Sequence, residues 1–492
     1  MALSFFSKKL SILFVIYHNG LIFSHVSLSY FHMFVIIKHM IKLMGNKDIY
    51  KKIWVVALPI IFQNIIDAAV NSADILMLNY VGQDAISAVS LANSMVGILF
   101  MFLYGIGTGI AMLAAQYYGK GDLKTIEKVE GIGLKFALSV AILGAIACIS
   151  LPRLLMRIYT SEDVLVDIGS KYLVFISLGL IFWAISAVYM AILRCIGKVA
   201  ISTVLEAVAL ITNVCLNAVF IFGLFGAPKL GVTGVAIATT ISRFVQLVGC
   251  IIVSMSKPGV ALTFKTMFQR HKLLEKDFIS MAMPAIGNDL VWSLAFSVYS
   301  IILGHLGNDA VAANSIVNVV RNLGCVMCYG IGSASGIIVG QILGEGSVDE
   351  GIKAGHICLR LATITGIIGG LIVLALMPFT LSHASLTPLA LDYLKFMLFV
   401  NVYYISGTSI NTCLIAGVFR AGGDSKFGFK CDLIDMWAYA VPLGLLAAFV
   451  LKLPVKVVYF LLCTDEFVKW PWVFKHFYSH KWAKNITREE ID

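Results

Sequence analysis

The chain contains twelve long apolar segments, separated by short breaks that carry charged residues, glycine or proline. A helix needs about 20 apolar residues to cross the ~30 Å hydrocarbon core of a bilayer. The predicted spans are 53–79, 86–115, 131–151, 172–193, 199–222, 232–255, 278–303, 313–343, 357–377, 391–416, 433–451 and 455–473. Only 13% of the 492 residues are charged, against about a quarter in soluble domains. The sequence therefore predicts an all-α integral membrane protein with twelve transmembrane helices.

Lysine and arginine residues in the connecting loops predict how the chain is oriented. The loops on one side carry fourteen of these residues and the loops on the other side carry six. Cytoplasmic loops are enriched in both residue types, so the richer side is predicted to be cytoplasmic. We therefore expect a multi-pass protein of the cell membrane with both termini in the cytoplasm. The loops also explain the net charge of +10, so we expect no nucleic-acid partner.

The first 43 residues do not fit this plan. Their apolar stretches are interrupted by His18, Asn19, His25 and His32, and they lack the three-part form of a cleaved signal peptide. A thirteenth span here would place the amino terminus outside the cell. We interpret residues 1–43 as an atypical extension and Met44, in MGNKDIYKKIW, as the real or an alternative start.

An internal repeat divides the chain into two halves. A shift of 225 positions aligns 59–122 with 284–347 without a gap, and 17 of these 64 positions are identical. Further on, LRCIGK at Leu193 matches FRAGGD at Phe419 with a shift of 226. We expect an N-lobe of helices 1–6 (44–256), a cytoplasmic linker (257–277), a C-lobe of helices 7–12 (278–475) and a cytoplasmic tail (476–492). Two similar six-helix lobes around a central cavity are typical of secondary transporters.

The first predicted span carries polar residues on one face. At 100° per residue, Gln63, Asp67, Asn71 and Asp74 fall within an arc of about 80°. An ionised aspartate in mid-membrane costs about 2.5–3.5 kcal/mol. Two of them on one face indicate a water-filled cavity or a cation partner, and they suit proton binding and release. The alternative is that Asp74 lies near the end of its span and meets bulk water.

Two further sets of polar residues lie inside predicted spans. Glu206, Asn213 and Asn217 share one face of the fifth span, because they are seven and four residues apart. Asp289 in the seventh span and Arg321 in the eighth are intramembrane charges. They could form an ion pair that closes the second half of the molecule, or they could point at separate wet surfaces.

The repeated motifs resemble those of the multidrug and toxic compound extrusion (MATE) family. The resemblance rests on ALPIIFQN with SADILMLNYVG, on AAQYYGKGD and VGQILGEG after the second and eighth spans, and on NVCLNAVFIFG with GVTGVAIATTISR. It covers about residues 50–475. It implies two six-helix lobes and export of organic cations, coupled to inward movement of H⁺ or Na⁺.

The resemblance also implies a cation site in the N-lobe, at Asp74, Asn213 and Thr239. Asn217 departs from the family pattern, since many relatives have a second aspartate there and an amide cannot titrate. Asp67 stands where relatives often have an uncharged residue, so it is a candidate for the missing carboxylate. In one branch of the family the C-lobe holds a second site, but Trp292 and Ser409 occupy those positions here. The C-lobe is therefore expected to be poorer in acids and to lack that site.

These features predict a secondary antiporter for small organic cations, with Asp74, Asn213, Asn217 and Thr239 as the Na⁺ ligands if sodium is the coupling ion. The alternative is a flippase for lipid-linked saccharides, which shares the two-lobe plan. A flippase cavity would need several basic residues to meet a diphosphate, whereas Arg243 and Arg321 are the notable ones inside the spans. We expect a monomer surrounded by lipid and without a cofactor. We also expect no enzyme activity, because all ten histidines lie outside the spans.

Overall fold

The computed structural model describes residues 47–256, 259–384 and 386–489, and this part of the chain is helical without strands. Two compact units divide the chain, Met1–Lys52 and Ile53–Asp492. Of the first unit, only the beginning of α2 is described. The predictions for residues 1–43 and for the start at Met44 lie outside the described residues.

Within the second unit, which begins at Ile53 inside α2, the helices up to residue 255 form what we call the N-lobe. They are α2 (Lys47–Asn79), α3 (Gln83–Lys120), α4 (Leu123–Ser150), α5 (Pro152–Arg157), α6 (Asp163–Cys195), α7 (Val199–Phe222) and α8 (Val232–Met255). The turn from α3 to α4 follows from the sequence: Gly121 takes a left-handed φ of 80°, and the Asp122 side chain accepts a hydrogen bond from Thr125 N at 3.0 Å. A buried apolar cluster around Val89, Val96 and Leu173 is the core of this lobe.

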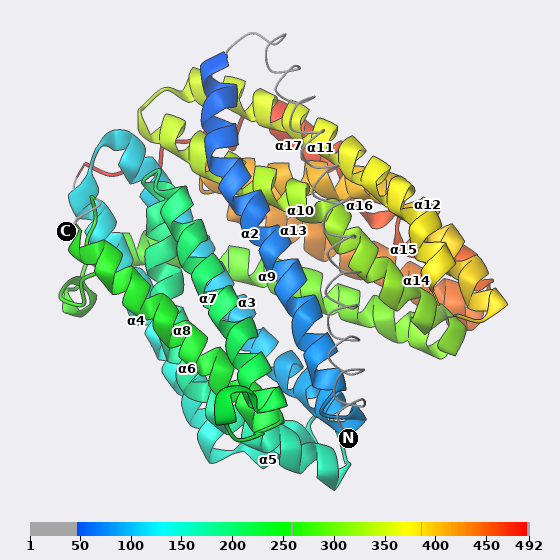
Figure 1. Cartoon of the computed structure of the whole chain (residues 1–492). Coiled ribbons are helices and arrows are strands. Elements are labelled where there is room, and N and C mark those ends of the chain that lie inside the picture. The colour runs from blue at the N-terminus through cyan, green and yellow to red at the C-terminus, as the bar shows by residue number, and fades with distance from the viewer. Residues whose placement is uncertain (1–46, 257–258, 385, 490–492) are drawn as a thin grey trace. The chain divides into compact units, whose positions relative to one another are not determined.

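The helices from residue 272 onward form what we call the C-lobe (Figure 1). Its long helices are α9 (Lys272–His305), α10 (Asn308–Gly344), α11 (Val348–His383) and α12 (Pro388–Asn411). After them the chain contains π-helical turns, in the order η3 (Thr412–Phe419), α13 (Ser425–Ile434), η4 (Asp435–Ala440), α14 (Val441–Leu445) and η5 (Leu446–Val450). The last helices are α15 (Val455–Leu462), α16 (Asp465–Val468) and α17 (Trp470–Tyr478).

The predicted spans agree with the helices except at the end of the chain. Eleven helices among the described residues are long and apolar enough to cross a membrane. The segment predicted as the twelfth span, 455–473, is helical but is broken between α15 and α16 and again at Lys469. Large apolar side chains such as Leu143 on α4, Leu371 on α11 and Phe399 on α12 are exposed. Such outward-facing side chains are suited to contact lipid.

Paired contacts between the lobes follow the sequence repeat. A Cβ atom added to Gly105 on α3 would lie 2.3 Å from the Ile286 side chain on α9, and one added to Gly330 on α10 would lie 2.3 Å from the Ile61 side chain on α2. Gly330 and Ile286 stand 225 positions after Gly105 and Ile61. The repeat therefore packs each half against the other in the same way, and glycine allows the helices to approach closely.

The same symmetry joins the lobes at the end where α3 and α10 finish. A Cβ atom on Gly119 would lie 1.9 Å from the backbone oxygen of Gln341, and one on Gly344 would lie 1.9 Å from that of Gln116. The Gln116 amide donates to Ala421 O at 2.7 Å, and the Gln341 amide donates to Cys195 O at 2.7 Å. Each glutamine thus binds a backbone oxygen of the other lobe.

The carboxy-terminal segment strengthens only one of these two contacts. Gln116 also donates to Lys484 O at 2.9 Å and accepts from Ile486 N at 2.8 Å. The Arg488 guanidinium forms an ion pair with Asp277. The segment therefore lies over the junction of the lobes and binds Gln116.

Candidate functional site

Four of the predicted N-lobe residues form one hydrogen-bonded chain across three helices. Asn217 on α7 donates to the Asp74 carboxylate of α2 at 2.8 Å and to Asn213 Oδ1 at 3.2 Å. Asn213 in turn donates to Thr239 Oγ1 on α8 at 3.1 Å. Thr239 ends the chain by donating to the Val235 carbonyl at 3.0 Å. The helical spacing four residues apart is what brings Asn213 and Asn217 together.

This chain leaves oxygen atoms available for a proton or a small cation. Asn217 Oδ1 is buried and has no hydrogen-bond partner among the described residues. Asp74 receives its hydrogen bond from Asn217 on Oδ1, and its second oxygen can take a proton or face a cation. One carboxylate with amide and hydroxyl oxygens suits a hard monovalent ion or a proton. That the four residues bind a coupling ion stays a prediction.

An ion pair lies next to this chain in the N-lobe. Arg243 on α8 binds Glu206 on α7 at 2.9 Å, and Gln246 donates to the same carboxylate at 2.5 Å. Asp67 on α2 is half buried and close enough to feel the charges of both Glu206 and Arg243. Asp67 therefore belongs to the same electrostatic environment as this pair. It forms no hydrogen bond to Asp74.

Gln63 and Asn71 are the two other polar residues predicted on the polar face of the first span. Gln63 is half buried. The side chain of Asn71 lies outside the described side chains. Among the described side chains, Gln63 makes no hydrogen bond to the Asp74 chain.

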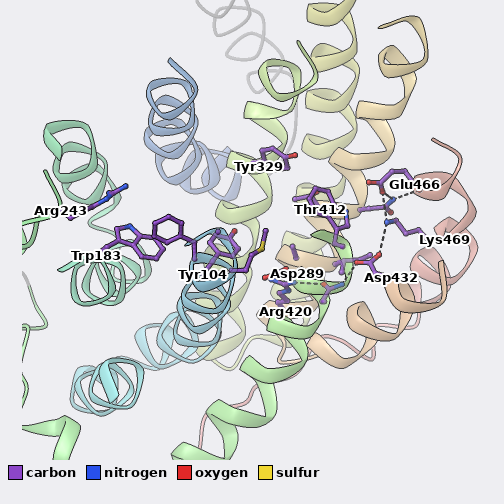
Figure 2. Close-up of a pocket in the computed structure, with 18 residues that line it drawn as sticks. Tyr104, Trp183, Arg243, Asp289, Tyr329, Thr412, Arg420, Asp432, Glu466 and Lys469 are labelled. Carbon is purple, nitrogen blue, oxygen red and sulfur yellow. Dashed lines mark hydrogen bonds and ion pairs between the residues drawn. The ribbon is translucent and has the colours of Figure 1, made fainter. Parts of the chain in front are cut away.

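A cavity of about 630 Å³ lies between the two lobes (Figure 2). Figure 2 shows Arg243 and Trp183 on one side of it, and Lys469, Asp432 and Glu466 on the other. Its wall combines aromatic rings with charged groups of both signs. The lining residues are Gly97, Phe100, Met101, Tyr104, Trp183, Arg243, Asn288, Asp289, Trp292, Tyr329, Asn411, Thr412, Ile415, Ala416, Arg420, Asp432, Glu466 and Lys469.

The C-lobe side of the cavity is built on one buried lysine. The Lys469 ammonium lies 3.1 Å from Asp432, 3.1 Å from Glu466 and 3.8 Å from Asp435. Asp465, which precedes Glu466, is also fully buried. Lys469 lies between α16 and α17, three residues after Glu466. We call Lys469 with its four acidic neighbours the Lys469 cluster.

Polar side chains of neighbouring helices orient two members of the Lys469 cluster. Asn288 donates to Asp432 at 2.6 Å. Asn411 donates to Glu466 at 2.6 Å, and Thr408 donates to its other carboxylate oxygen at 3.2 Å. Asp432 and Glu466 are therefore well supported as ionised groups, as buried charges need to be.

Of the two alternatives for Asp289 and Arg321, the ion pair between them does not form. Asp289 binds Arg420 at 2.7 Å, and Arg420 also donates to Asn288. Arg321 instead donates to Asn318 at 2.9 Å, and its guanidinium lies 5.2 Å from the centre of the Phe296 ring. Arg420 follows the predicted span 391–416, yet its side chain is buried at the end of η3 and reaches across to Asp289 on α9.

Two further expectations about the C-lobe are also corrected. The lobe is not poorer in acids, because the Lys469 cluster holds four carboxyl groups within it. Basic residues inside the molecule are also more numerous than Arg243 and Arg321, since Arg420 and Lys469 line the cavity. The shortage of acids was predicted from Trp292 and Ser409, which occupy the positions of the family's C-lobe site. The acids of this lobe lie on other elements, namely α13, η4 and α16.

The repeat itself was the signal that could have found these residues. Asp432 stands 226 positions after Glu206, and Lys469 stands 226 positions after Arg243, with the same shift that relates Phe419 to Leu193. The N-lobe and C-lobe ion pairs are therefore equivalent in the two halves. Asp465 likewise stands 226 positions after Thr239.

The sequence profile of the MatE family matches residues 59–219 and 284–446, one segment in each half. The chain is 24% identical to "Uncharacterized transporter YisQ" of Bacillus subtilis over 84% of this chain and 90% of that protein. It is also 24% identical to "Probable multidrug resistance protein NorM" of Thermotoga maritima, over 90% of this chain and 96% of that protein.

A solved structure supports the fold. The "Crystal structure of MATE in the straight conformation" superposes with a TM-score of 0.80, covering 88% of this chain and 97% of that chain at 18% identity. At that identity the likeness concerns the fold, which is the two-lobe arrangement of twelve membrane segments. The cavity and its lining residues are properties of this sequence.

Proposed function

The chain belongs to the MatE family of membrane transporters, and on that premise we propose that it is a secondary active multidrug exporter. In this proposal organic cations leave the cell in exchange for H⁺ or Na⁺. The observation that carries the proposal is the Asp74–Asn217–Asn213–Thr239 chain. The relative in Thermotoga maritima, a probable multidrug resistance protein, supports the same function.

The lining of the cavity suits organic cations. Aromatic faces attract cations, and a mixed apolar wall with a few charged groups accepts ligands of different shapes. Tyr104, Trp183 and Trp292 supply the rings, while Asp289 and Asp432 supply carboxylates. Met101 adds a flexible apolar contact. We infer that positively charged aromatic compounds are the substrate class.

Coupling in this proposal follows from competition between two states. A coupling ion at Asp74 favours one conformation and the organic cation favours the other, and each shifts the equilibrium only by its difference in affinity. The loop charges favour an orientation in which the junction at Gln116 and Gln341 faces the cytoplasm. In this proposal the contacts at that junction join the lobes on the cytoplasmic side and close the cavity toward the cytoplasm.

A lipid-linked saccharide flippase remains the second candidate because Arg243, Arg420 and Lys469 line the cavity. Each of these cations already has a carboxylate partner within 3.1 Å, namely Glu206, Asp289 and Asp432. A diphosphate would have to displace those partners. The paired charges therefore favour the exporter.

The test uses purified protein in liposomes loaded with ethidium, with the membrane potential clamped. A proton gradient and a sodium gradient are imposed in separate runs. We expect one of the two gradients to drive ethidium movement, and Asp74→Asn and Asp67→Asn to abolish it without loss of folded protein. Asp84→Asn is the matched control, because this aspartate is exposed and lies at the outer end of α3.

The outcomes separate the two candidates. Movement under one gradient names the coupling ion. If neither gradient moves ethidium, the exporter proposal fails and transfer of a lipid-linked diphosphate is tested in the same liposomes. Unchanged transport in Asp74→Asn would contradict the assigned coupling site even if ethidium moves.

A further inference from the structure

The Lys469 cluster contains more acid than base. Four carboxyl groups, those of Asp432, Asp435, Asp465 and Glu466, surround one ammonium group, and all five side chains are nearly inaccessible to water. Arg420 also lines the cavity, but it is bound to Asp289. If every acid were ionised, the cluster would carry an uncompensated negative charge, which a buried site does not tolerate.

The four carboxyl groups differ in how well the ionised form is supported. Asp432 and Glu466 each receive the ammonium and amide donors. Asp465 accepts from Glu466 N at 2.8 Å and from the Tyr299 hydroxyl at 3.3 Å. Asp435 receives no hydrogen bond: both of its oxygen atoms are buried without a partner among the described residues.

Asp435 nevertheless points into the cluster. Its Oδ2 atom lies 3.8 Å from the Lys469 ammonium, too far for a hydrogen bond but close enough for a direct contact after a small shift. The residue is 1% exposed, on the first turn of η4. Because no donor in the described structure stabilises a charge on Asp435, its protonated, neutral form suits this buried position. When Asp435 is ionised, the Lys469 ammonium is close enough to pair with it.

We propose that the Lys469 cluster is a second proton-binding site of this protein, in which Asp435 carries the proton. A proton fits better than a metal ion, because no three His, Cys, Asp or Glu side chains in the described part of the chain are arranged to hold a metal. The site is separate from the Asp74 chain, which lies in the other lobe. It also uses α13, η4 and α16, not the positions of Trp292 and Ser409.

The charged and titratable groups that face Asp435 come from every element around it. Lys469 approaches it from between α16 and α17. The others are Asp432 on α13, Asp465 and Glu466 on α16, and Tyr299 on α9. Lys469 is the cation shared among the acids, so its position decides which carboxyl group is neutralised.

Lys469 also connects the proton to the cavity, and this step rests on the proposed export function. Asp432, Glu466 and Lys469 line the cavity, whereas Asp435 does not. An organic cation that binds Asp432 and Glu466 competes with the Lys469 ammonium, which then moves to Asp435. The O–H bond of Asp435 breaks and the new carboxylate pairs with the ammonium. The proton leaves past Lys469, which contacts both Asp435 and the cavity, and passes to water there. Substrate and proton thereby exclude each other.

The first experiment reads carboxyl protonation directly and needs no substrate. Infrared difference spectra of the full protein in liposomes are recorded between acidic and alkaline pH. We expect Asp435→Asn to remove one component of the protonated-carboxyl C=O band, and Asp74→Asn to leave that component in place. Asp392→Asn, an exposed partner of Lys456, is the control. An unchanged band in Asp435→Asn would overturn the proposal.

A second variant, Lys469→Arg, tests the proposal if Asp435→Asn does not fold. Lys469→Arg retains the positive charge but changes its distance to Asp435, so the midpoint at which the band titrates should shift. A midpoint equal to that of the wild-type protein would contradict the role of Lys469 as the shared cation.

A third measurement separates the site from its coupling role. Ethidium is added to detergent-purified protein in weak buffer with a pH-indicator dye, and we expect Asp435→Asn to release about one proton fewer per molecule than the wild type. Equal release in both proteins would overturn the coupling step. If ethidium does not bind at all, the export function fails, while the infrared result still decides whether Asp435 holds a proton.

Discussion

The two lobes share one backbone plan but distribute their charges in opposite ways. The N-lobe ion pair Glu206–Arg243 contains one acid and one base, and its equivalent in the C-lobe, Asp432–Lys469, stands among three more acids. The first helix of the N-lobe carries Asp74, where the C-lobe has Tyr299, 225 positions later. A duplicated scaffold can therefore keep its packing while each half carries different chemistry.

The difference also concerns which helix supplies the acid. In the N-lobe the aspartate is on the first helix of the lobe, and a hydroxyl group, Thr239, is on the last. In the C-lobe the hydroxyl of Tyr299 is on the first helix, and Asp465 is on the last segment, with 3.3 Å between them. The carboxyl group and the hydroxyl group have exchanged helices between the two halves. We infer that the lobes respond differently to pH and to removal of a cation.

The largest expected effect is on stability when each lobe loses its central cation. Lys469→Met leaves four buried carboxyl groups without a counter-ion, and breaking such a pair costs about 3–5 kcal/mol. Arg243→Met should cost less, because Glu206 keeps the hydrogen bond from Gln246 and the arginine is partly accessible. The two variants are compared by unfolding free energy in the same detergent.

The same two variants can contradict the difference between the lobes. Equal losses of stability would mean that the surplus of acids in the C-lobe has no energetic consequence. Lys469→Arg is the control for packing, since it keeps the charge and most of the side-chain volume.

The second-largest effect concerns the close glycine contacts between α3 and α10, which are equivalent in the two lobes. Gly119→Ala and Gly344→Ala each place a methyl group 1.9 Å from a backbone oxygen of the opposite helix. The helices must separate, and overpacking of this kind costs about 1–3 kcal/mol. We expect similar losses of thermal stability for both variants, because the two contacts are equivalent in the repeat.

A glycine on the same helix provides the control for these substitutions. A Cβ atom on Gly336 would meet Gly417 O at 3.5 Å, an ordinary contact. Gly336→Ala should therefore retain the stability of the wild type. Unequal effects of Gly119→Ala and Gly344→Ala would show that the junction is not symmetric in energy.

The helices and the repeat could be predicted from the sequence because both depend on local patterns. Apolar length gives the membrane helices, and a constant shift of 225 gives the two lobes. The grouping of Asn213 with Asn217 follows from helical spacing alone. Which charges meet between helices does not follow from such patterns, because it depends on the rotation of each helix and on the reach of long side chains.

Arg420 and Lys469 illustrate that limit. Arg420 follows a predicted span and is adjacent to glycines, which indicates a loop, yet its side chain extends back to Asp289. Lys469 lies inside the predicted twelfth span, where it pairs with Glu466, three residues earlier, and with Asp432 of α13. Its equivalent Arg243 pairs with Glu206 of α7 from a continuous helix. Apolar length predicts neither pair, because it does not fix the face of the helix on which a charge lies.

The smallest expected effect concerns the junction at Gln116 and Gln341, where the symmetry is incomplete. Gln341 makes one hydrogen bond across the lobes, to Cys195 O, whereas Gln116 makes three, to Ala421 O and to the carboxy-terminal segment. Each bond contributes about 0.5–1.5 kcal/mol. Gln116→Ala should therefore shift the population toward separated lobes more than Gln341→Ala does.

Spin labels at positions 124 and 349, which are 225 residues apart and exposed, report that separation as a distance distribution. Cys215 is the one exposed cysteine and is replaced by serine in all samples, while the other cysteines stay buried. A tail truncated after residue 483 removes the Lys484 and Ile486 bonds but keeps the bond to Ala421. Truncation should therefore bring Gln116 to the level of Gln341, so that Gln116→Ala and Gln341→Ala have equal effects in the shortened protein. If the two substitutions still differ there, the asymmetry of the junction comes from the lobes themselves and not from the tail.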